Sequence, residues 1–344
     1  MENRSNSPPH VLIFPLPYQG HVNSMLKLAE LLSLAGINIT FLNSERNHKL
    51  LARYTNIEDR FAKHPGFRFQ TITDGLPLDH PRSGDQLMEL FDAMKLITKP
   101  LFKKLVLETK PPVNCIIGDG VLGFTGDVAI EVGVPIIYFR TVSACSFWAY
   151  FSIPDIIEGG QLPIRGNEDM DRLITKVPGM ETFLRCRDLP SFCRVSDMTD
   201  RNLLLVMNET RQSPRANALI LNTFEDLEGP ILSQIRTQCP KIYSIGPLHE
   251  HLQAKLSAKN EKSCQSSNSL REIDRSCMTW LDNQEIVEKM VNDLMVERRD
   301  VFLRSATRMA ELSGKSVREG GSSYCDLNRL IEDIRLMSVR SDDI

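Results

Sequence analysis

The sequence predicts an α/β protein in which a parallel, doubly wound sheet carries helices on both faces. Short apolar runs, bounded by glycine and proline, alternate with longer segments of helical period between residues 10 and 247. Consecutive strands that are separated by helices pair in parallel, so this alternation predicts one open sheet. Residues 285–344 show helical patterns and no strand pattern. We therefore expect this segment to be helix-only, with no sheet of its own.

A strand, a loop and a helix open the predicted sheet. The apolar run Val11–Leu16 predicts a buried strand, and Gly20 and His21 lie in the short loop before an amphipathic helix. Pro100 is expected to kink or break a long helix over 86–108. Further strands are predicted at 37–42, 66–72, 113–117, 135–139, 218–224 and 242–245, and further helices at 121–132, 143–150, 225–235, 285–310 and 325–337.

Changes in composition divide the sequence into four parts. Residues 1–9 are polar and predicted to be disordered, whereas residues 10–247 form the domain of the sheet. Lysine, serine, asparagine and glutamine dominate residues 248–275, which predicts a flexible linker. A helical segment, 276–344, follows. The apolar face of its helix 285–310 has no sheet to cover, so we expect it to dock on the sheet domain or to stay exposed and favour self-association.

The composition is that of an ordinary globular protein. The chain has 344 residues, of which 42% are hydrophobic and 25% charged, and its formal net charge is −3. There is no basic stripe, so nucleic acid is not expected as a partner. The polar start and the lack of any apolar run of bilayer length predict neither a secretion signal nor a membrane span, and hence a cytoplasmic protein. Eight cysteines without CxxC or zinc-type spacing predict free thiols and no metal site.

One glycine-rich segment matches the pattern of a dinucleotide-binding loop. Residues 118–123 read G-x-G-x-x-G after a predicted strand and before a predicted helix. They do not form the first βα turn, however, and no carboxylate stands near residue 140, where a ribose would be bound. A nicotinamide or flavin cofactor is therefore not expected.

Two titratable side chains are predicted at the carboxyl edge of the sheet, where open α/β sheets bind ligands. His21 follows the first strand, and histidine is a natural general base because its unperturbed pKa lies near neutrality. Asp119 follows the strand 113–117, and a carboxylate on the imidazole N–H would fix its tautomer and stabilise the imidazolium. Helix capping or a turn is the competing interpretation for each residue.

Further candidates for a substrate site follow the strand 135–139. Thr141 and Ser143 could reach a sugar hydroxyl, or else cap the next helix. Phe147 and Trp148 could line an apolar acceptor pocket, although aromatic residues more often belong to the core. Gly20, beside His21, is the last predicted substrate-binding position.

Several segments together resemble a known family. They are HVLIFPLPYQGHVNSMLKLAELL from residue 10, CIIGDGVLGF from 115, PIIYFRTVSACSFWAYF from 135, VPGMETFLRCRDLPSF from 177, ALILNTFEDLEGPILSQI from 218 and IYSIGPL from 242. They are similar to the N-terminal half of plant UDP-dependent glycosyltransferases of family 1, and in particular to iridoid glucosyltransferases of the 7-deoxyloganetic acid type. VEKMVNDLMVERRDVFLRSA from 287 and EGGSSYCDLNRLI from 319 resemble that family's last helices.

The resemblance implies a GT-B-like fold of two facing Rossmann-like domains, with a small lipophilic acceptor on the N-terminal domain and UDP-glucose on the C-terminal one. It also implies roles for three residues: His21 as the base that deprotonates the acceptor oxygen, Asp119 as its orienting partner and Thr141 as a contact of the donor sugar. The implied reaction is an inverting displacement at the anomeric carbon. It releases UDP and needs neither a metal nor a cofactor.

One stretch departs from the family pattern. In the family, WLD-x-Q is followed by a strand, a serine-bearing phosphate loop and the donor motif with its W-x-P-Q, H-x-G-W-N-S and D/E-Q elements. Here Trp280–Gln284 runs directly into Glu285, so on the order of 130 residues, about one Rossmann-like half, are missing. This argues against binding of a UDP-sugar. The chain is either a glucosyltransferase or a truncated, inactive isoform that binds acceptor or a full-length partner, and affinity for UDP-glucose separates the two hypotheses.

Overall fold

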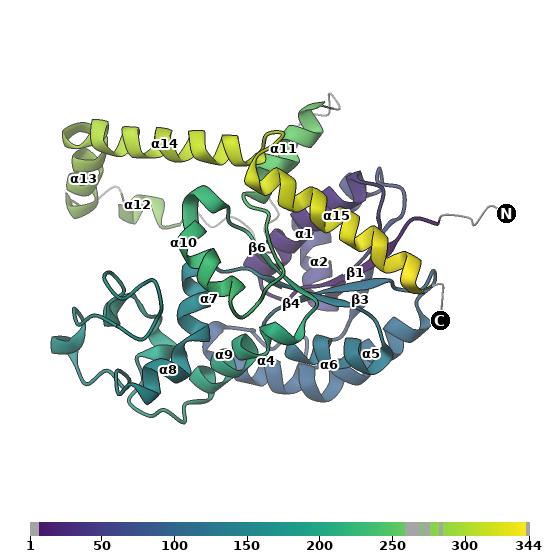
Figure 1. Cartoon of the computed structure of the whole chain (residues 1–344), viewed down its shortest axis with the longest axis horizontal. Helices are drawn as coiled ribbons and strands as arrows, with labels where there is room; N and C mark the ends of the chain where they lie inside the picture. Colours follow the sequence, from purple (N-terminus) through teal and green to yellow (C-terminus); the bar gives the residue numbers. More distant parts are fainter. Residues whose placement is uncertain (1–6, 259–269, 271–275, 282–284, 342–344) are drawn as a thin grey trace.

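The computed structural model describes residues 7–258, 270, 276–281 and 285–341. Its centre is a seven-stranded sheet in which all neighbouring strands are parallel, in the order β3-β2-β1-β4-β5-β6-β7 (Figure 1). The strands are β1 (His10–Phe14), β2 (Asn38–Ser44), β3 (Phe67–Ile72), β4 (Cys115–Asp119), β5 (Ile136–Arg140), β6 (Ala218–Leu221) and β7 (Ile242–Ser244). The predicted parallel sheet is confirmed, and each predicted strand is present with small shifts at its ends.

The strand order reverses between β1 and β4. On one side of β1 the sheet continues through β2 and β3, and on the other side through β4 to β7. Ile13 in β1 pairs with Phe41 on the first side and with Ile117 on the second. At such a switch point a crevice opens outside the carboxyl ends of the strands. The loops after β1 and β4 are therefore where the fold itself offers a ligand site.

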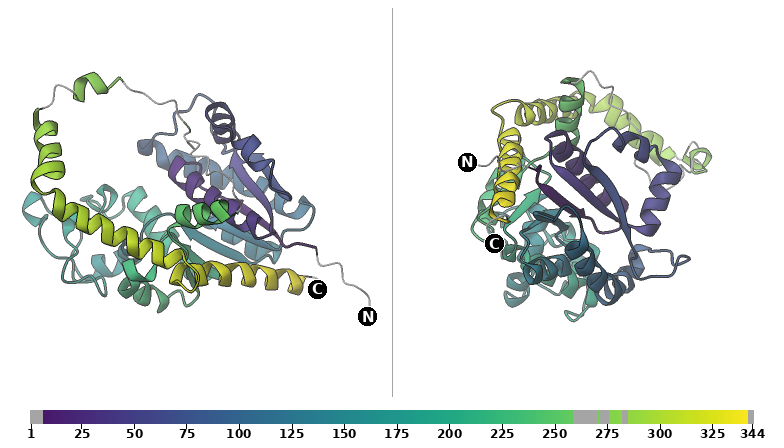
Figure 2. Two further views of the ribbon diagram at one scale, coloured as in Figure 1. Left: turned by 90° about the horizontal axis from the view of Figure 1, so that it is seen from above. Right: turned by 90° about the vertical axis from the view of Figure 1, so that its right-hand side faces the viewer.

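Two helical layers cover the sheet, as the alternation of side chains along β1 requires (Figure 2). Val11 and Ile13 belong to one apolar cluster, and Leu12 and Phe14 belong to the other. The first cluster is covered by α1 (Gln19–Leu34), α2 (Glu45–Tyr54), α3 (Ile57–Phe61), α11 (Leu248–Ala258) and α15 (Ser322–Ser341). The second is covered by α4 (Leu87–Ala93), α5 (Lys99–Glu108), α6 (Gly123–Val132), α7 (Ala144–Phe151), α8 (Ile153–Glu158), α9 (Arg201–Arg211) and α10 (Glu225–Arg236).

The last helix, α15, belongs to the sheet domain. Leu327, Leu330, Ile331 and Ile334 recur at helical spacing and are buried in the same cluster as the side chains of α1 and α11. α15 also packs against β4 and β7, across one face of the sheet (Figure 1). The described part of the predicted segment 276–344 is helical as expected, but the structure places α15 in the core of the first domain.

Three further helices, α12 (Met278–Leu281), α13 (Glu285–Asn292) and α14 (Arg299–Val317), lead out from the sheet domain and back to it (Figures 1 and 2). The single helix predicted at 285–310 is in fact two helices. A π-helical turn at Asp293–Glu297 follows α13, and Arg298 then leaves helical geometry with φ −111° and ψ 12°. The chain bends at this point.

The prediction of a linker over 248–275 is wrong for its first part. Residues 248–258 form α11, in which Leu248, Leu252 and Leu256 are buried and which packs against α1. Leucines four residues apart form one helical stripe, and the polar composition between them concealed it. Leu270 is 7% exposed. The remainder of the predicted linker lies outside the described residues.

Two other expectations change in detail. The chain stays helical through α4, a π-helical turn at Met94–Thr98 and α5, and Pro100 closely follows the π-helical turn. The expected break is therefore a local widening of one continuous helix. Residues 1–6 of the predicted disordered start lie outside the described ranges. Pro8 and Pro9 are bound to β2, since their carbonyls accept hydrogen bonds from the side chain and the N–H of Asn38 at 3.3 and 2.8 Å.

Candidate functional site

Three of the predicted site residues lie together at the carboxyl ends of neighbouring strands. His21 is the third residue of α1, just after β1; Asp119 is the last residue of β4; and Thr141 directly follows β5. The strands β1, β4 and β5 are adjacent, and the order reverses between the first two. Parallel pairing thereby brings together residues that are 98 and 120 positions apart in the sequence.

The closest contact in this group joins His21 to Asp119. Nδ1 of His21 lies 2.6 Å from Oδ2 of Asp119. An ionised carboxylate can only accept, so Nδ1 carries the hydrogen and Nε2 is the unprotonated nitrogen of the neutral ring. The side chain of His21 is 24% exposed and that of Asp119 is 1% exposed. A solvent-accessible ring is therefore held in one tautomer by a buried carboxylate.

Asp119 is ionised although it is buried. Burial alone would raise the pKa of its carboxyl, but the His21 ring and two backbone N–H groups outweigh burial and hold the pKa below its ordinary value of 3.8. The N–H of Leu16 donates to Oδ2 at 3.0 Å, and the N–H of Val121 donates to Oδ1 at 3.2 Å. The loops after β1 and β4 thus both hold this carboxylate.

Two other predicted substrate-binding residues, Thr141 and Gly20, lie next to His21, the first in space and the second in the sequence. Oγ1 of Thr141 is 3.1 Å from Nδ1 and 3.4 Å from Nε2 of His21, so it lies over the face of the His21 ring, close to both nitrogens. Gly20 is exposed in the first turn of α1, and no atom lies within 4 Å of the place where a Cβ would stand. The structure brings Thr141 to His21, while no steric requirement accounts for the glycine.

The glycine-rich segment 118–123 is filled by side chains of this protein. A Cβ on Gly120 would stand 2.3 Å from Cδ of Arg140, and a Cβ on Gly123 would stand 2.1 Å from Oε2 of Glu209. The same carboxylate accepts a hydrogen bond from the N–H of Gly123 at 2.8 Å. A pyrophosphate would need that helix N-terminus for itself. Close packing therefore explains these glycines.

A second carboxylate occupies the N-terminus of α7. Glu228 accepts hydrogen bonds from the N–H groups of Ala144 at 3.0 Å and Cys145 at 2.8 Å. Ser143 caps the same helix by accepting from the N–H of Ser146 at 3.1 Å, as its competing interpretation proposed. Sequence reasoning missed Glu209 and Glu228, because they come from helices more than 80 positions away and no local pattern marks them.

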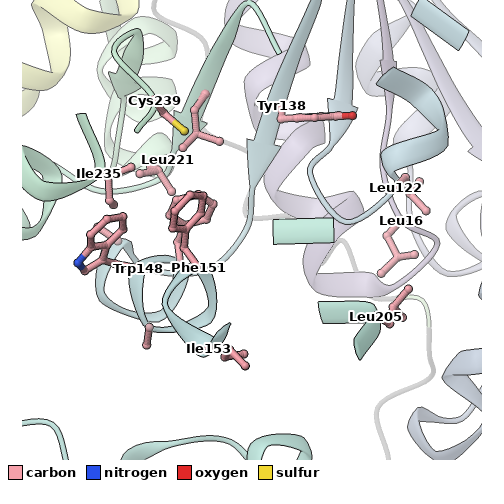
Figure 3. Close-up of a cluster of buried hydrophobic side chains, with 14 of the residues drawn as sticks. Leu16, Leu122, Tyr138, Trp148, Phe151, Ile153, Leu205, Leu221, Ile235 and Cys239 are labelled. Carbon is pink, nitrogen blue, oxygen red and sulfur yellow. The ribbon is translucent and has the colours of Figure 1, made fainter. Parts of the chain in front are cut away.

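Phe147 and Trp148 lie in the core of the sheet domain. Phe147 is 0% and Trp148 is 4% exposed. The rings of Trp148 and Phe151 lie side by side (Figure 3) and stack with centroids 5.4 Å apart. Nε1 of Trp148 donates to the carbonyl of Pro178 at 2.9 Å. The guanidinium of Arg140 lies 5.4 Å from the centre of the Phe147 ring. Core packing, the competing interpretation, describes both residues.

The other side of α7 faces an open groove with a volume of about 310 Å³. One wall is formed by α7 and the other by the irregular segment that follows α8. The lining residues are Cys145, Ser146, Ala149, Tyr150, Met180, Phe183, Leu184, Asp188, Leu189 and Pro190. Neither Phe147 nor Trp148 lines this groove. Only the rotation of α7 against the sheet decides which residues face the groove, and an apolar run on both sides of a helix does not reveal that rotation.

The described residues also bear on metal binding, cysteine pairing and membrane insertion. Within these ranges, no three His, Cys, Asp or Glu side chains gather in a way that could hold a metal ion. The seven cysteines described are free thiols, as predicted. No helix in the same part of the chain is long and apolar enough to cross a membrane.

The fold and the site together define a doubly wound α/β protein with a His–Asp pair at its switch point. A 7-deoxyloganetic acid glucosyl transferase of Catharanthus roseus is 58% identical over 287 residues, which cover 81% of this chain and 59% of that protein. A myricetin 3-O-rhamnoside 1,2-glucosyltransferase of Crocosmia x crocosmiiflora is 36% identical over 331 residues, 92% of this chain and 68% of that protein. The crystal structure of Medicago truncatula UGT71G1 complexed with UDP-glucose matches 82% of this chain and 59% of its own, with a TM-score of 0.59 and 21% identity. No protein-family model matches the chain.

The chain belongs to the plant UDP-glycosyltransferases. The predicted resemblance is thereby confirmed, and the structural likeness confirms the GT-B-like fold of the sheet domain. The chain spans 59% of the length of each of the two Catharanthus roseus relatives. This coverage is consistent with the segment that the sequence lacks after Gln284.

Proposed function

We propose that this protein transfers glucose from UDP-glucose to a hydroxyl or carboxyl group of a small lipophilic plant metabolite of the iridoid or terpenoid kind. The observation that carries the proposal is the contact of 2.6 Å between Nδ1 of His21 and Asp119 at the switch point of the sheet. The names of the relatives support the substrate class, since one acts on 7-deoxyloganetic acid. The solved structure from Medicago truncatula contains UDP-glucose.

In the proposed reaction, Nε2 of His21 takes the proton of an acceptor hydroxyl while the acceptor oxygen attacks the anomeric carbon of the glucose. The bond from that carbon to the diphosphate oxygen breaks, UDP leaves and the configuration inverts. The buried carboxylate of Asp119 stabilises the imidazolium that results. Thr141 Oγ1, next to the ring, is assigned to the donor sugar, and Gly20 and Ser143 are assigned to substrate binding as well. The reaction needs no metal and no cofactor beyond the donor substrate.

We assign the acceptor to the groove along α7. Its lining combines apolar side chains such as Met180, Phe183 and Leu184 with the hydroxyls of Ser146 and Tyr150. Mostly apolar walls with a few polar groups are typical of sites for small molecules, and volumes of roughly 300 Å³ and above hold them. α7 begins three residues after Thr141, so one short loop joins the groove to the His21 ring.

A second candidate function is binding of the acceptor, or of a full-length relative, without transfer. The length of the chain favours it, because the relatives contain a segment that this chain lacks. In the described residues of 276–341 there are helices and no strand. The N-termini of α6 and α7, next to the site, are occupied by Glu209 and Glu228. Without donors for the diphosphate, charge on the leaving group would go unstabilised, and such donors contribute several kcal/mol.

Transfer and donor binding can be measured on the full chain. UDP-glucose and a panel of iridoid, terpenoid and flavonoid acceptors would be supplied, glucosides detected by mass and binding of each substrate measured by calorimetry. His21→Ala is the test variant, and His249→Ala, at a side chain that is 65% exposed, is the matched control. Hydroxyl acceptors should lose more activity in His21→Ala than carboxylic acids do, because an ionised carboxylate needs no base.

Three results are decisive. Product that disappears in His21→Ala and persists in His249→Ala supports the glucosyltransferase. Acceptor binding without any affinity for UDP-glucose supports the second candidate. A chain that binds neither substrate contradicts both transfer and acceptor binding, and leaves of the second candidate only the binding of a full-length relative.

A further inference from the structure

We propose that residues 285–311, here called the arm, pair with the arm of a second copy of this chain in an antiparallel, two-fold symmetric interface. The arm comprises α13, the π-helical turn after it and the first three turns of α14. α14 joins it to the sheet domain, where only Ser316 and Val317 at the end of that helix are buried (Figure 1). This inference is independent of the proposed function, because it uses no residue of the candidate site.

The arm exposes much more apolar surface than the domain that carries it. Every residue from 294 to 311 is exposed. Met290 is 68% exposed, Val296 67% and Met295 58%. α14 becomes buried only at its C-terminal end, at Ser316 and Val317. Exposed apolar patches of this kind mark sites of protein association.

The exposed apolar side chains follow helical spacing. Leu294, in the π-helical turn, follows Met290 and Val291 of α13 at four and three residues. Phe302, Ala306 and Met309 are spaced four and three residues apart on α14. Each half of the arm therefore carries an apolar stripe of the kind that a helix normally buries against a partner.

The charges of the arm divide into an acidic and a basic half. Residues 285–297 carry four carboxylates and one lysine, and residues 298–308 carry four arginines and one aspartate; Glu311 follows at the end of the arm. The acidic half contains Glu285, Glu288, Lys289, Asp293 and Glu297, and the basic half contains Arg298, Arg299, Asp300, Arg304 and Arg308. The change of sign falls at the bend between the two helices.

This pattern is self-complementary in only one orientation. If two arms lie antiparallel, each acidic half faces the basic half of the other arm, and the match occurs twice about a two-fold axis. If they lie parallel, like charges face each other. An isologous interface requires the same surface on both partners, and the arm provides it with apolar stripes between opposite charges. The partner that this surface fits is therefore a second copy of this chain.

The test is a charge reversal that can be repaired. One variant carries Glu288→Arg and Glu297→Arg, and the other carries Arg304→Glu and Arg308→Glu. In each variant both halves of the arm carry the same sign of charge, so two copies of one variant should repel each other. We expect a dimer Kd at least about tenfold higher than that of the wild type, measured by analytical ultracentrifugation. An equimolar mixture should form a heterodimer, because two basic halves then face two acidic halves. Formation of that heterodimer also shows that both variants are folded.

Other results would overturn the proposal. A wild-type chain that stays monomeric across the accessible concentrations has no such interface. If trypsin fails to cut a monomer at the arginines of the arm, the arm is docked on its own chain, and if trypsin cuts there readily, the arm is left for a different protein. A dimer that both charge variants leave intact pairs through another surface. A dimer that weakens as the salt concentration rises from about 0.05 to 0.5 M, in contrast, agrees with the charge pattern.

Discussion

Asp326, near the start of α15, accepts two hydrogen bonds from Ser244, the last residue of β7. The N–H of Ser244 lies 2.7 Å and its hydroxyl 2.8 Å from Oδ2 of Asp326. Ser244 is fully buried. A second polar contact joins the same two elements, since the hydroxyl of Tyr243 donates to Asp333. Polar bonds to an edge strand therefore accompany the apolar stripe that fixes α15 to the sheet.

Replacing Asp326 by alanine should destabilise the protein by about 2–3 kcal/mol, because two buried donors of Ser244 lose a charged acceptor. Urea unfolding followed by circular dichroism measures the change. Glu332→Ala is the matched control on the same helix, at a side chain that is 64% exposed, and it should change stability by less than about 0.5 kcal/mol. Equal stabilities of the two variants would contradict this account of α15.

Stability should fall as the pH drops from neutrality toward 4, in part because of His251 on α11. Burial, followed by the charge of Lys255, lowers the pKa of His251 to about 4, and Nε2 of its ring lies 2.8 Å from the hydroxyl of Ser323. The unfolded chain binds this proton near pH 6.5, so the contribution is complete above that pH and is lost as the pH falls toward 4. The full loss is about 3 kcal/mol.

The variant His251→Gln isolates this effect, because the buried His10, whose pKa burial also lowers, is present in both proteins. Urea unfolding at pH 7 and pH 4.5 gives the pH dependence of each protein. The variant should show the smaller difference between the two pH values. An unchanged difference would mean that His251 is not the group that titrates.

Asp119→Asn should reverse the tautomer of the neutral His21 ring. The carboxylate accepts from Nδ1–H, whereas an asparagine side chain can instead donate to Nδ1 and leave the hydrogen on Nε2. The ¹⁵N chemical shifts of the ring distinguish the two tautomers directly, without any assay of activity. A variant with the wild-type shifts would show that another group, such as Thr141, sets the tautomer.

The variants Trp148→Ala and Phe183→Ala should distinguish a side chain of the core from one that lines the groove along α7. Removing the buried indole should cost about 3–5 kcal/mol and lower the melting temperature, because it leaves a cavity and an unpaired carbonyl at Pro178. Phe183 lines the groove and is 51% exposed, so its loss should leave stability nearly unchanged and weaken acceptor binding. Calorimetry with an acceptor and thermal unfolding measure both effects. If Trp148→Ala instead weakened acceptor binding and left stability unchanged, Trp148 would belong to the acceptor site.

The sheet and the His21–Asp119 pair could be predicted because both follow from short-range patterns and one rule of topology. A strand that is buried on both faces has a continuous apolar run in its sequence, and such runs occur at β1, β4 and β5. Parallel strands end at a common edge, so a histidine after β1 and an aspartate at the end of β4 had to come close if these strands were neighbours.

What could not be predicted depends on contacts between distant segments. Glu209 and Glu228 reach the N-termini of α6 and α7 from other helices, and neither carries a local signal. The side of α7 that faces the groove is set by its packing against the sheet. The role of α15 was hidden for the same reason, because an amphipathic helix does not specify in its own sequence which apolar surface it covers.

The position of α15 makes the sheet domain discontinuous in sequence. Residues 7–258 supply the strands and most of the covering helices, and residues 322–341 complete the layer. The sequence between these two segments is therefore an insertion into one domain, and we expect α15 to keep its place when the insertion is shortened or exchanged. A chain that is cut within the insertion should accordingly stay together as two fragments, with the smaller held by its four buried apolar side chains and by Asp326.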